Sequence, residues 1–89
     1  MINSSNLLEK NKETYNRNYK LYRAKYCRET GLPMYNWRDY PQMIENGIYT
    51  RTRAKQEKVK INEEIPVGWY RLQHGYTPLF KAVVEEELE

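Results

Sequence analysis

The sequence predicts a small α+β domain in which a long N-terminal basic helix and one or two short helices precede a C-terminal β-hairpin. Tyrosines recur at helical spacing in the first third, turn and capping residues divide the middle, and two β-rich runs flank a short turn near the end. A chain of 89 residues is long enough for one domain and not for two. We expect residues 1–6 and 85–89 to be frayed ends.

The first helix is expected over residues 7–30. Four tyrosines in this stretch follow the four-three-four spacing of a coiled-coil seam, and we call them the tyrosine stripe: Tyr15, Tyr19, Tyr22 and Tyr26. Gly31 suits the left-handed position after a helix, and Pro33 cannot continue one, so both residues predict the helix end. The tyrosine stripe is then either the face that packs on the core or an interface with a partner.

Two short helices are expected in the middle of the chain. Residues 39–45 combine Asp39 as a cap with a proline in the first turn, and Asn46-Gly47 then breaks the helix. Thr50 or Thr52 is a candidate cap for a basic helix over residues 53–58.

The last third changes from helical to strand-like spacing. Residues 67–72 and 76–83 are rich in β-branched and aromatic residues around Gln73-His74-Gly75, which predicts a hairpin. Pro78 lacks a backbone donor, so it places the second strand at a sheet edge or marks a bulge. Five apolar residues are expected to form the core against the long helix: Trp37, Trp69, Leu72, Leu79 and Phe80.

Charge is distributed unevenly along the chain. The net charge is only +3, yet 13 basic and five acidic residues lie between Lys10 and Lys60, whereas acidic residues predominate from Ile61 to Glu89. A basic surface of this kind implies an anionic partner, which is nucleic acid, a nucleoprotein or an acidic protein surface.

Composition also indicates the compartment. A single cysteine, Cys27, excludes an internal disulfide framework and fits a reducing environment. The first residues are mostly polar and do not resemble a signal peptide, and no stretch approaches the roughly 18 apolar residues of a membrane span. We therefore expect a cytoplasmic protein of a bacterial or an infected host cell, with no membrane association.

The basic residues of the first helix are the leading candidates for binding. Solvated helix faces normally alternate in sign, and the stretch from Thr14 to Arg28 holds no acid. Its cations are expected to contact phosphates: Arg17, Lys20, Arg23, Lys25 and Arg28. A second basic group is expected to join them in one patch: Arg51, Arg53, Lys55 and Lys58. For both groups the alternative is an ordinary solvated surface.

Aromatic residues of the connector before the short helices complete the candidate contact surface. Tyr35, Trp37 and Tyr40 are interleaved with cations, which suits stacking on unpaired bases. The same residue types dominate protein interfaces. Trp37 is therefore a candidate both for the core and for the contact surface.

Residues for catalysis are scarce. His74 and Cys27 are the only residues of their kind, no nucleophile motif surrounds either one, and no Cys/His spacing fits a zinc site. The sequence has no glycine-rich phosphate loop. We expect no enzyme activity, no cofactor and no metal.

Residues 48–82 resemble short modules in small accessory proteins of bacteriophages and mobile elements. The likeness rests on Tyr49-Thr50-Arg51-Thr52-Arg53-Ala54-Lys55, on Pro66-Val67-Gly68-Trp69-Tyr70 and on Gly75-Tyr76-Thr77-Pro78-Leu79-Phe80. It implies an accessory or inhibitor protein, with anti-CRISPR proteins among the candidates, and it brings no catalytic residues.

Together these features predict a small non-enzymatic protein that docks a basic, tyrosine-rich surface on nucleic acid or a nucleoprotein. A phage-encoded inhibitor of an RNA-guided nuclease fits this description, because the guide and the channels of such a complex present anionic phosphates to their surroundings. The alternative is a protein-only interaction module that uses the tyrosine stripe as an interface with a partner or in a homodimer.

Overall fold

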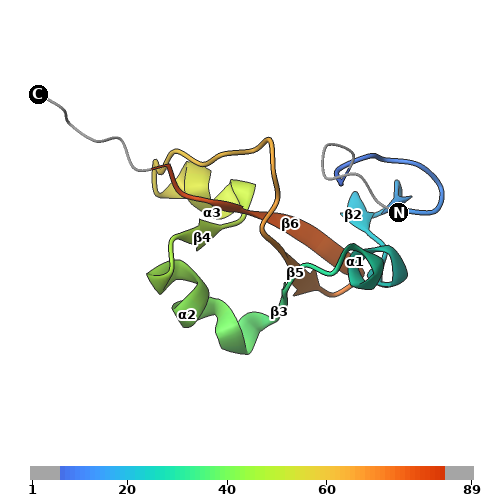
Figure 1. Ribbon diagram of the computed structural model, residues 1–89, viewed down its shortest axis with the longest axis horizontal. Coiled ribbons are helices and arrows are strands. Elements are labelled where there is room, and N and C mark those ends of the chain that lie inside the picture. The colour runs from blue at the N-terminus through green and yellow to red at the C-terminus, as the bar shows by residue number, and fades with distance from the viewer. Residues whose placement is uncertain (1–6, 84–89) are drawn as a thin grey trace, which may run out of the picture.

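The computed structural model describes residues 7–83 (Figure 1), so the predicted frayed ends at residues 1–6 and 85–89 lie outside the described part. The first elements are β1 (Tyr15–Asn16), β2 (Leu21–Tyr22) and α1 (Ala24–Thr30). Then follow β3 (Met34–Tyr35), the 3-10 helix η2 (Trp37–Asp39), α2 (Tyr40–Glu45), β4 (Ile48–Tyr49) and α3 (Arg51–Gln56). The last strands are β5 (Gly68–Leu72) and β6 (Gly75–Lys81). No helix between residues 7 and 83 is long and apolar enough to cross a bilayer.

Strand β6 is the centre of a mixed six-stranded sheet, and it runs through the middle of the molecule in Figure 1. It pairs antiparallel with β5, with β2 and with β4. β1 pairs with β2, and β3 lies parallel to β5, so the strand order is β1-β2-β6-β5-β3 with β4 also beside β6. Residues from both ends of the described chain therefore meet in one sheet.

The predicted C-terminal hairpin is confirmed. Strands β5 and β6 pair from Leu72 with Gly75 to Gly68 with Leu79, and Gln73-His74 forms the two-residue turn between them. This short turn fixes the register of the hairpin.

Pro78 lies inside β6, a strand with partners on both sides, so the first of the two predicted alternatives, an edge strand, is wrong. The backbone nitrogen of Pro78 carries no hydrogen and faces the side of β6 that is opposite β5. On that edge the partner changes from β2 at Tyr76 to β4 at Phe80, so Pro78 falls in the gap between two strands. No ladder hydrogen bond is lost there, which explains how a central strand accepts proline.

The predicted long helix over residues 7–30 is wrong, and the fold class that depended on it is replaced by the mixed sheet with three short α-helices. Only Ala24–Thr30 is helical in this stretch. Asn11 Oδ1 accepts hydrogen bonds from the backbone N–H groups of Glu13 and Thr14, at 2.8 and 3.1 Å. The Thr14 hydroxyl donates to the carbonyl of Glu9 at 2.6 Å. Such side chains compete with the hydrogen bonds of a helix, and here they hold the backbone in turns.

The chain then reverses between β1 and β2. Asn16 Oδ1 accepts a hydrogen bond from the Asn18 N–H at 2.9 Å, and Lys20 adopts a φ of +58° in the turn of residues 17–20. Tyr15 lies opposite Tyr22 across the two strands, and their rings meet edge to face with centroids 4.8 Å apart. Cross-strand pairs of this kind stabilise a sheet. The tyrosine stripe is therefore divided among strand, turn and helix.

The signals for helix ends operate where the sequence places them. Gly31 and Gly47 adopt φ values of +78° and +76°, directly after α1 and close to the end of α2. Helix α3 spans Arg51–Gln56 and not the predicted residues 53–58, because Thr50 and not Thr52 caps it, with a hydroxyl that accepts a backbone hydrogen bond at 3.1 Å. Asp39 is not a side-chain cap of α2, because its carboxylate instead accepts from the Asn36 N–H at 3.0 Å and closes a capping box on η2.

Buried residues occupy both faces of the sheet, because successive side chains of a strand point to opposite sides. One cluster contains Tyr22, Tyr26, Cys27 and Trp69, and helix α1 supplies two of these residues. The other cluster contains Met43, Ile48 and Leu79, and helix α2 supplies the first of them.

The core prediction is correct for three residues and wrong for two. Trp69, Leu79 and Phe80 are fully buried. Trp37 is 70% exposed because it belongs to η2, and Leu72 is 41% exposed because it borders the turn of the hairpin. The predicted partner of these two side chains, the long helix, does not exist.

Candidate functional site

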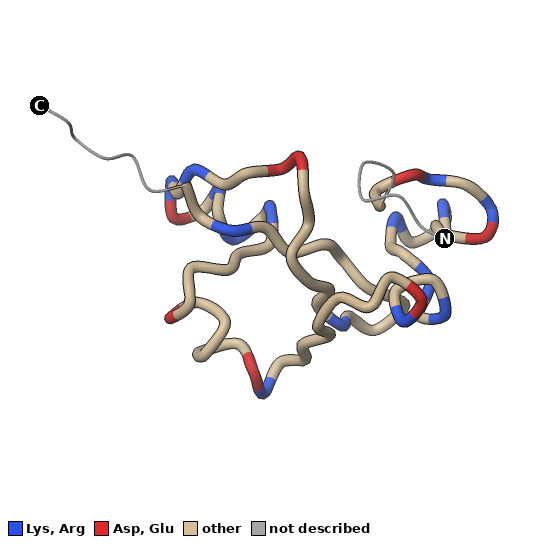
Figure 2. Tube along the Cα trace, in the orientation of Figure 1, with Lys and Arg blue, Asp and Glu red and all other residues tan. Residues whose placement is uncertain are grey.

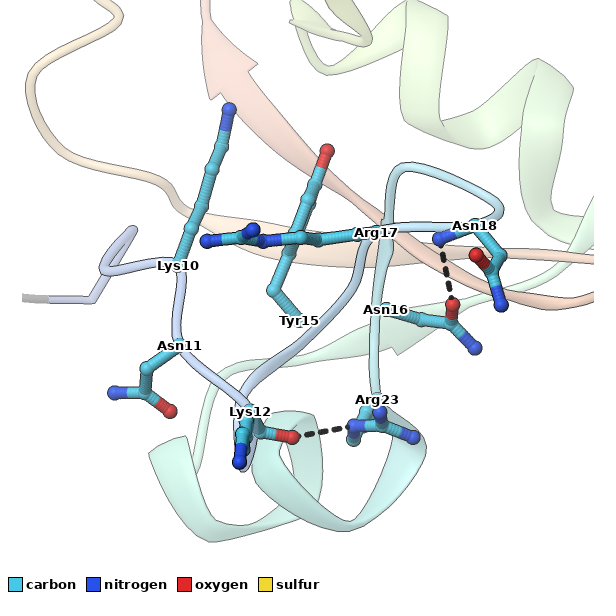
Figure 3. A pocket seen from close by; sticks show the side chains of 8 residues that line it. All are labelled: Lys10, Asn11, Lys12, Tyr15, Asn16, Arg17, Asn18 and Arg23. Carbon is cyan, nitrogen blue, oxygen red and sulfur yellow. Dashed lines mark hydrogen bonds between the residues drawn. The ribbon is translucent and has the colours of Figure 1, made fainter.

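A basic pocket of about 330 Å³ lies beside the β1–β2 turn (Figure 3). We call it the turn pocket and define it by its lining residues: Lys10, Asn11, Lys12, Tyr15, Asn16, Arg17, Asn18 and Arg23. Four of the eight are cations and none is acidic. The volume is at the lower end of the range for small-ligand sites.

Local structure brings the four cations of the turn pocket together. Lys10 and Lys12 lie on the loop that leads to β1, Arg17 begins the β1–β2 turn, and Arg23 precedes α1. The Asn and Thr hydrogen bonds that replace a helix fold this loop back, so that residues 10–12 face the segment after β2. In Figure 3, Lys10, Tyr15 and Arg17 line one end of the pocket, and Lys12 and Arg23 line the other.

Few contacts engage the charged ends of these side chains. Arg23 uses its Nε–H to donate to the Lys12 carbonyl at 2.8 Å, which positions the guanidinium and leaves its terminal nitrogens available. The Lys10 ammonium lies 5.0 Å from the centroid of the Tyr15 ring. None of the four cations forms an ion pair with a residue between 7 and 83. Several like charges without counter-charges give the pocket a positive potential that attracts anions.

The first predicted basic group does not form one face. Arg17 and Arg23 line the turn pocket, and Lys20 is exposed in the same turn. Lys25 lies on α1 in a pocket that also contains Glu13 and Glu29, so acidic residues surround it. Arg28 lies in a different pocket, which the β5–β6 turn helps to line. The sequence therefore identified two of the four cations of the turn pocket.

The second predicted basic group is partly neutralised. Arg51 pairs with Glu63 at 2.6 Å and lies over the Phe80 ring, with 5.0 Å between its Cζ and the ring centroid. Arg53 pairs with Glu57, also at 2.6 Å, and lies over the Tyr40 ring. The other two residues of the group, Lys55 and Lys58, are exposed and lie on and just after α3.

Most basic residues of the described chain gather in two regions rather than in one continuous patch (Figure 2). One region surrounds α3, and the other surrounds the N-terminal loop, β2 and α1. Burial raises the pKa of Tyr22 in the second region, and the positive charge of Arg51 opposes that rise. Its own salt bridge with Glu63 limits the positive potential that it adds there.

Of the predicted contact aromatics, only Trp37 is freely accessible. Tyr35 is half-buried in the cluster around Leu79. Tyr40 packs edge to face against Tyr70, with ring centroids 5.9 Å apart. These two tyrosines are therefore components of the core.

The tyrosine stripe is mostly internal as well. Tyr22 and Tyr26 are buried in the cluster around Trp69, and Tyr15 packs against that cluster. Tyr19 is half exposed, and its ring stacks on His74 with centroids 4.0 Å apart and 13° between the planes. A partner or a second copy of the chain therefore cannot reach the stripe as one surface.

Several contributors to basic surface were missed by sequence reasoning. Lys10 and Lys12 were assigned to the start of a helix and not to a site, and Arg38 and Arg71 lie outside the two basic runs. The available signal was the recurrence of asparagine in residues 11–18, which favours turns over a helix. A turn places neighbouring cations on one concave surface, whereas a helix distributes them around its axis.

The two side chains with catalytic potential, Cys27 and His74, both pack against other parts of the protein. Cys27 is fully buried, and burial raises the pKa of its thiol to about 12, so that the unreactive thiol form prevails at neutral pH. His74 stacks on Tyr19 in the contact between two turns. No group of three or more His, Cys, Asp or Glu residues in the described chain is arranged to hold a metal ion.

Comparison of the chain with protein-family models, with curated proteins and with solved structures gives no match. The resemblance of residues 48–82 to bacteriophage accessory proteins therefore stays a prediction from the sequence.

Proposed function

We propose that the protein binds nucleic acid, alone or within a nucleoprotein, by holding backbone phosphates in the turn pocket. The observation that carries the proposal is the convergence of four cations without an acidic residue among the lining side chains. Cations that are dispersed over a surface attract any anion weakly. Cations that converge in a concave pocket can neutralise successive phosphates of one backbone.

The chemistry of the lining suits a phosphodiester in particular. Guanidinium groups such as those of Arg17 and Arg23 bind phosphate oxygens with paired N–H donors. The side-chain amides of Asn11, Asn16 and Asn18 add neutral polar groups around them. Tyr15 supplies an aromatic wall, which fits a sugar or a base attached to the phosphate.

The biological setting predicted from the sequence fits this activity. A phage-encoded inhibitor of an RNA-guided nuclease would meet the phosphates of a guide or of a target strand. An acidic protein surface is the competing partner, because carboxylates also bind arginine.

Salt dependence of binding tests the proposal. We would measure fluorescence polarisation of a labelled oligonucleotide of about 12 nucleotides between about 50 and 200 mM salt. Four contacts to a single strand predict a slope near −2.8 for log K against log salt, taking about −0.7 for each neutralised phosphate. A slope close to zero would refute phosphate binding.

A matched pair of variants locates the site. The double variant Lys12→Gln, Arg17→Gln removes two charges from the turn pocket, and neither side chain makes a hydrogen bond within residues 7–83. We expect it to weaken binding and to reduce the slope by about 1.4. Lys55→Gln, Lys58→Gln removes the same charge near α3 and should leave the slope unchanged. Equal losses in both variants would show attraction by net charge and not by the turn pocket.

A further inference from the structure

Two further acid-free pockets lie near the turn of the β5–β6 hairpin. The first has a volume of about 410 Å³ and includes Arg28 from α1 together with Arg71 and His74. The second has a volume of about 540 Å³ and includes Trp37 and Arg38 from η2 together with Arg71. The two pockets share the residues 71–73 that lead into the turn, so they are neighbours along that segment.

A ring contact joins the β1–β2 turn beside the turn pocket to the β5–β6 turn beside this pair. Tyr19, which follows Arg17 and Asn18 in the β1–β2 turn, stacks on His74 of the β5–β6 turn. Arg23 of the turn pocket directly precedes Ala24, which lines the first of the two hairpin pockets. The residues that line the three pockets include no carboxylate, so a ligand that extended from the turn pocket to the hairpin turn would meet none among them.

The acid-free lining distinguishes these three pockets from two other pockets of the described residues. The pocket beside α3 includes Glu63, which pairs with Arg51, and the pocket that contains Lys25 includes Glu13 and Glu29. Carboxylates repel a polyanion, so the neighbouring pockets do not offer an alternative route.

Trp37 gives this end of the surface a flat apolar face. Its side chain is 70% exposed, whereas the other tryptophan, Trp69, is fully buried. The guanidinium of Arg38 lies 5.4 Å from the Trp37 ring centroid, and Leu72 is exposed in the same pocket. An indole ring left in water beside two arginines is a platform on which a nucleobase stacks, with its phosphates near the cations.

We infer that the ligand is a single-stranded nucleic acid that runs from the turn pocket past the hairpin turn and stacks an unpaired base on Trp37. The inference rests on the proposed function and specifies its substrate class. A duplex keeps its bases stacked inside the helix, so it offers no base face to Trp37. A single strand has both a charged backbone and accessible base faces. The cations of the pockets match the backbone, and Trp37 matches a base face.

Tryptophan fluorescence tests the stacking directly. Trp37 is accessible and Trp69 is buried, so quenching by an added ligand reports on Trp37. We expect a single strand of about 12 nucleotides to quench the emission, and a duplex of the same sequence to leave it unchanged. The variant Trp37→Phe serves as the control, because its remaining emission comes from Trp69 and should not respond.

Affinity measured by polarisation provides the second readout. We expect Trp37→Ala to bind the single strand about 5- to 150-fold more weakly, in line with the loss of one base–aromatic stack, and Trp37→Phe to retain most of the affinity. Retention of full affinity by Trp37→Ala, with the salt dependence intact, would overturn the inference and leave the proposed function standing. Absence of salt-dependent binding to any oligonucleotide would instead refute the proposed function.

An acidic peptide is the competing occupant of the Trp37 pocket, since Arg38 and Arg71 also attract carboxylates. A peptide of alternating glutamate and leucine is a suitable probe. If it quenches Trp37 and the single strand does not, the pocket is a peptide site and the inference is wrong. If only the single strand quenches Trp37, the inference is supported.

Discussion

Replacing Tyr22 and Tyr26 with phenylalanine removes the two hydroxyl groups that hold the N-terminal loop against the core. Tyr22 Oη donates to the Leu8 carbonyl at 2.7 Å, and Tyr26 Oη donates to the Leu7 carbonyl at 2.8 Å. The loop that begins there carries two cations of the turn pocket. The double variant therefore tests whether buried tyrosines of the core position a binding surface that they do not line.

The expected cost follows from burial of the hydrogen bonds. Both tyrosine rings are more than nine-tenths buried, and phenylalanine keeps the ring contacts, so the hydroxyls are the only groups lost. The hydrogen bond of Tyr26 is buried and that of Tyr22 is partly buried. Leaving a buried carbonyl without its donor costs about 1–3 kcal/mol, and the cost is expected at the lower end for the partly buried one. The total for both changes need not be the sum, because Tyr22 and Tyr26 are in contact. The rest of the fold depends on β5 and β6 and should remain.

Three measurements test the consequences. Urea unfolding monitored by circular dichroism gives the free energy of unfolding, and we expect a decrease of about 1–3 kcal/mol for each replacement. Hydrogen exchange at the Thr14 amide, which donates to Asn11, should accelerate as the loop opens. Nucleic-acid binding should weaken as Lys10 and Lys12 leave the pocket, with a fall in salt slope of about 1.4.

Tyr70→Phe is the matched control. Tyr70 packs in the other cluster, and its hydroxyl makes no hydrogen bond with a residue between 7 and 83. We expect this variant to unfold at nearly the same urea concentration as the parent protein. If the Tyr22→Phe, Tyr26→Phe protein is no less stable than the control and exchanges its loop amides at the same rate, the two hydroxyls do not anchor the loop.

Three further predictions concern the fold. Gly75→Ala should lower the free energy of unfolding in urea by several kcal/mol. A Cβ at that position would lie 2.9 Å from the Tyr22 carbonyl oxygen and would push β2 away from β6. An unchanged urea midpoint would contradict the close approach of the two strands. Thr30→Val should cost about 1–3 kcal/mol, because the Trp69 indole N–H donates to the Thr30 hydroxyl at 2.9 Å and would lose its acceptor; Thr30→Ser, which keeps the hydroxyl, should cost less. Burial raises the folded-state pKa values of Tyr22 and Cys27 to about 12, from ordinary values of 10 and 9. The stability that the protonated groups provide is therefore complete below pH 9 and is lost as the pH rises to 12. Urea midpoints that stay constant over that interval would contradict the burial of these groups.

The parts of the fold that the sequence predicted are set by short-range chemistry. Gly31 and Gly47 end helices because glycine adopts a positive φ at little cost, and Thr50 begins one because its hydroxyl reaches a nearby N–H group. The hairpin around Gln73-His74 needs only two strand-forming runs and a short turn. Each of these interactions joins residues only a few positions apart, so the sequence contains all the information that they require.

The candidate site was predicted only in part, because its lining residues lie on a loop whose course the sequence did not reveal. Arg17 and Arg23 were identified from the absence of acidic neighbours, which is a property of the sequence itself. Their convergence with Lys10 and Lys12 depends on side chains that fold the loop back, such as Asn11 and its backbone partners. The exposure of Trp37 was not settled by the sequence either, because a large apolar residue is ordinarily expected to be buried. Its position in η2 leaves its side chain exposed to solvent.

The sequence by itself determined the sign of the charged surface, the ends of the short helices and the C-terminal hairpin, because composition and local hydrogen bonding do not depend on distant residues. Only the tertiary structure decided that residues 7–23 form a loop and a strand pair. A helical tyrosine spacing is compatible with both outcomes, and the choice depends on contacts far apart in the sequence: β2 pairs with β6 at Tyr76, and the hydroxyls of Tyr22 and Tyr26 reach the carbonyls of Leu8 and Leu7. Those contacts exist only once β6 is in place, and they turn a predicted basic helix into a basic pocket.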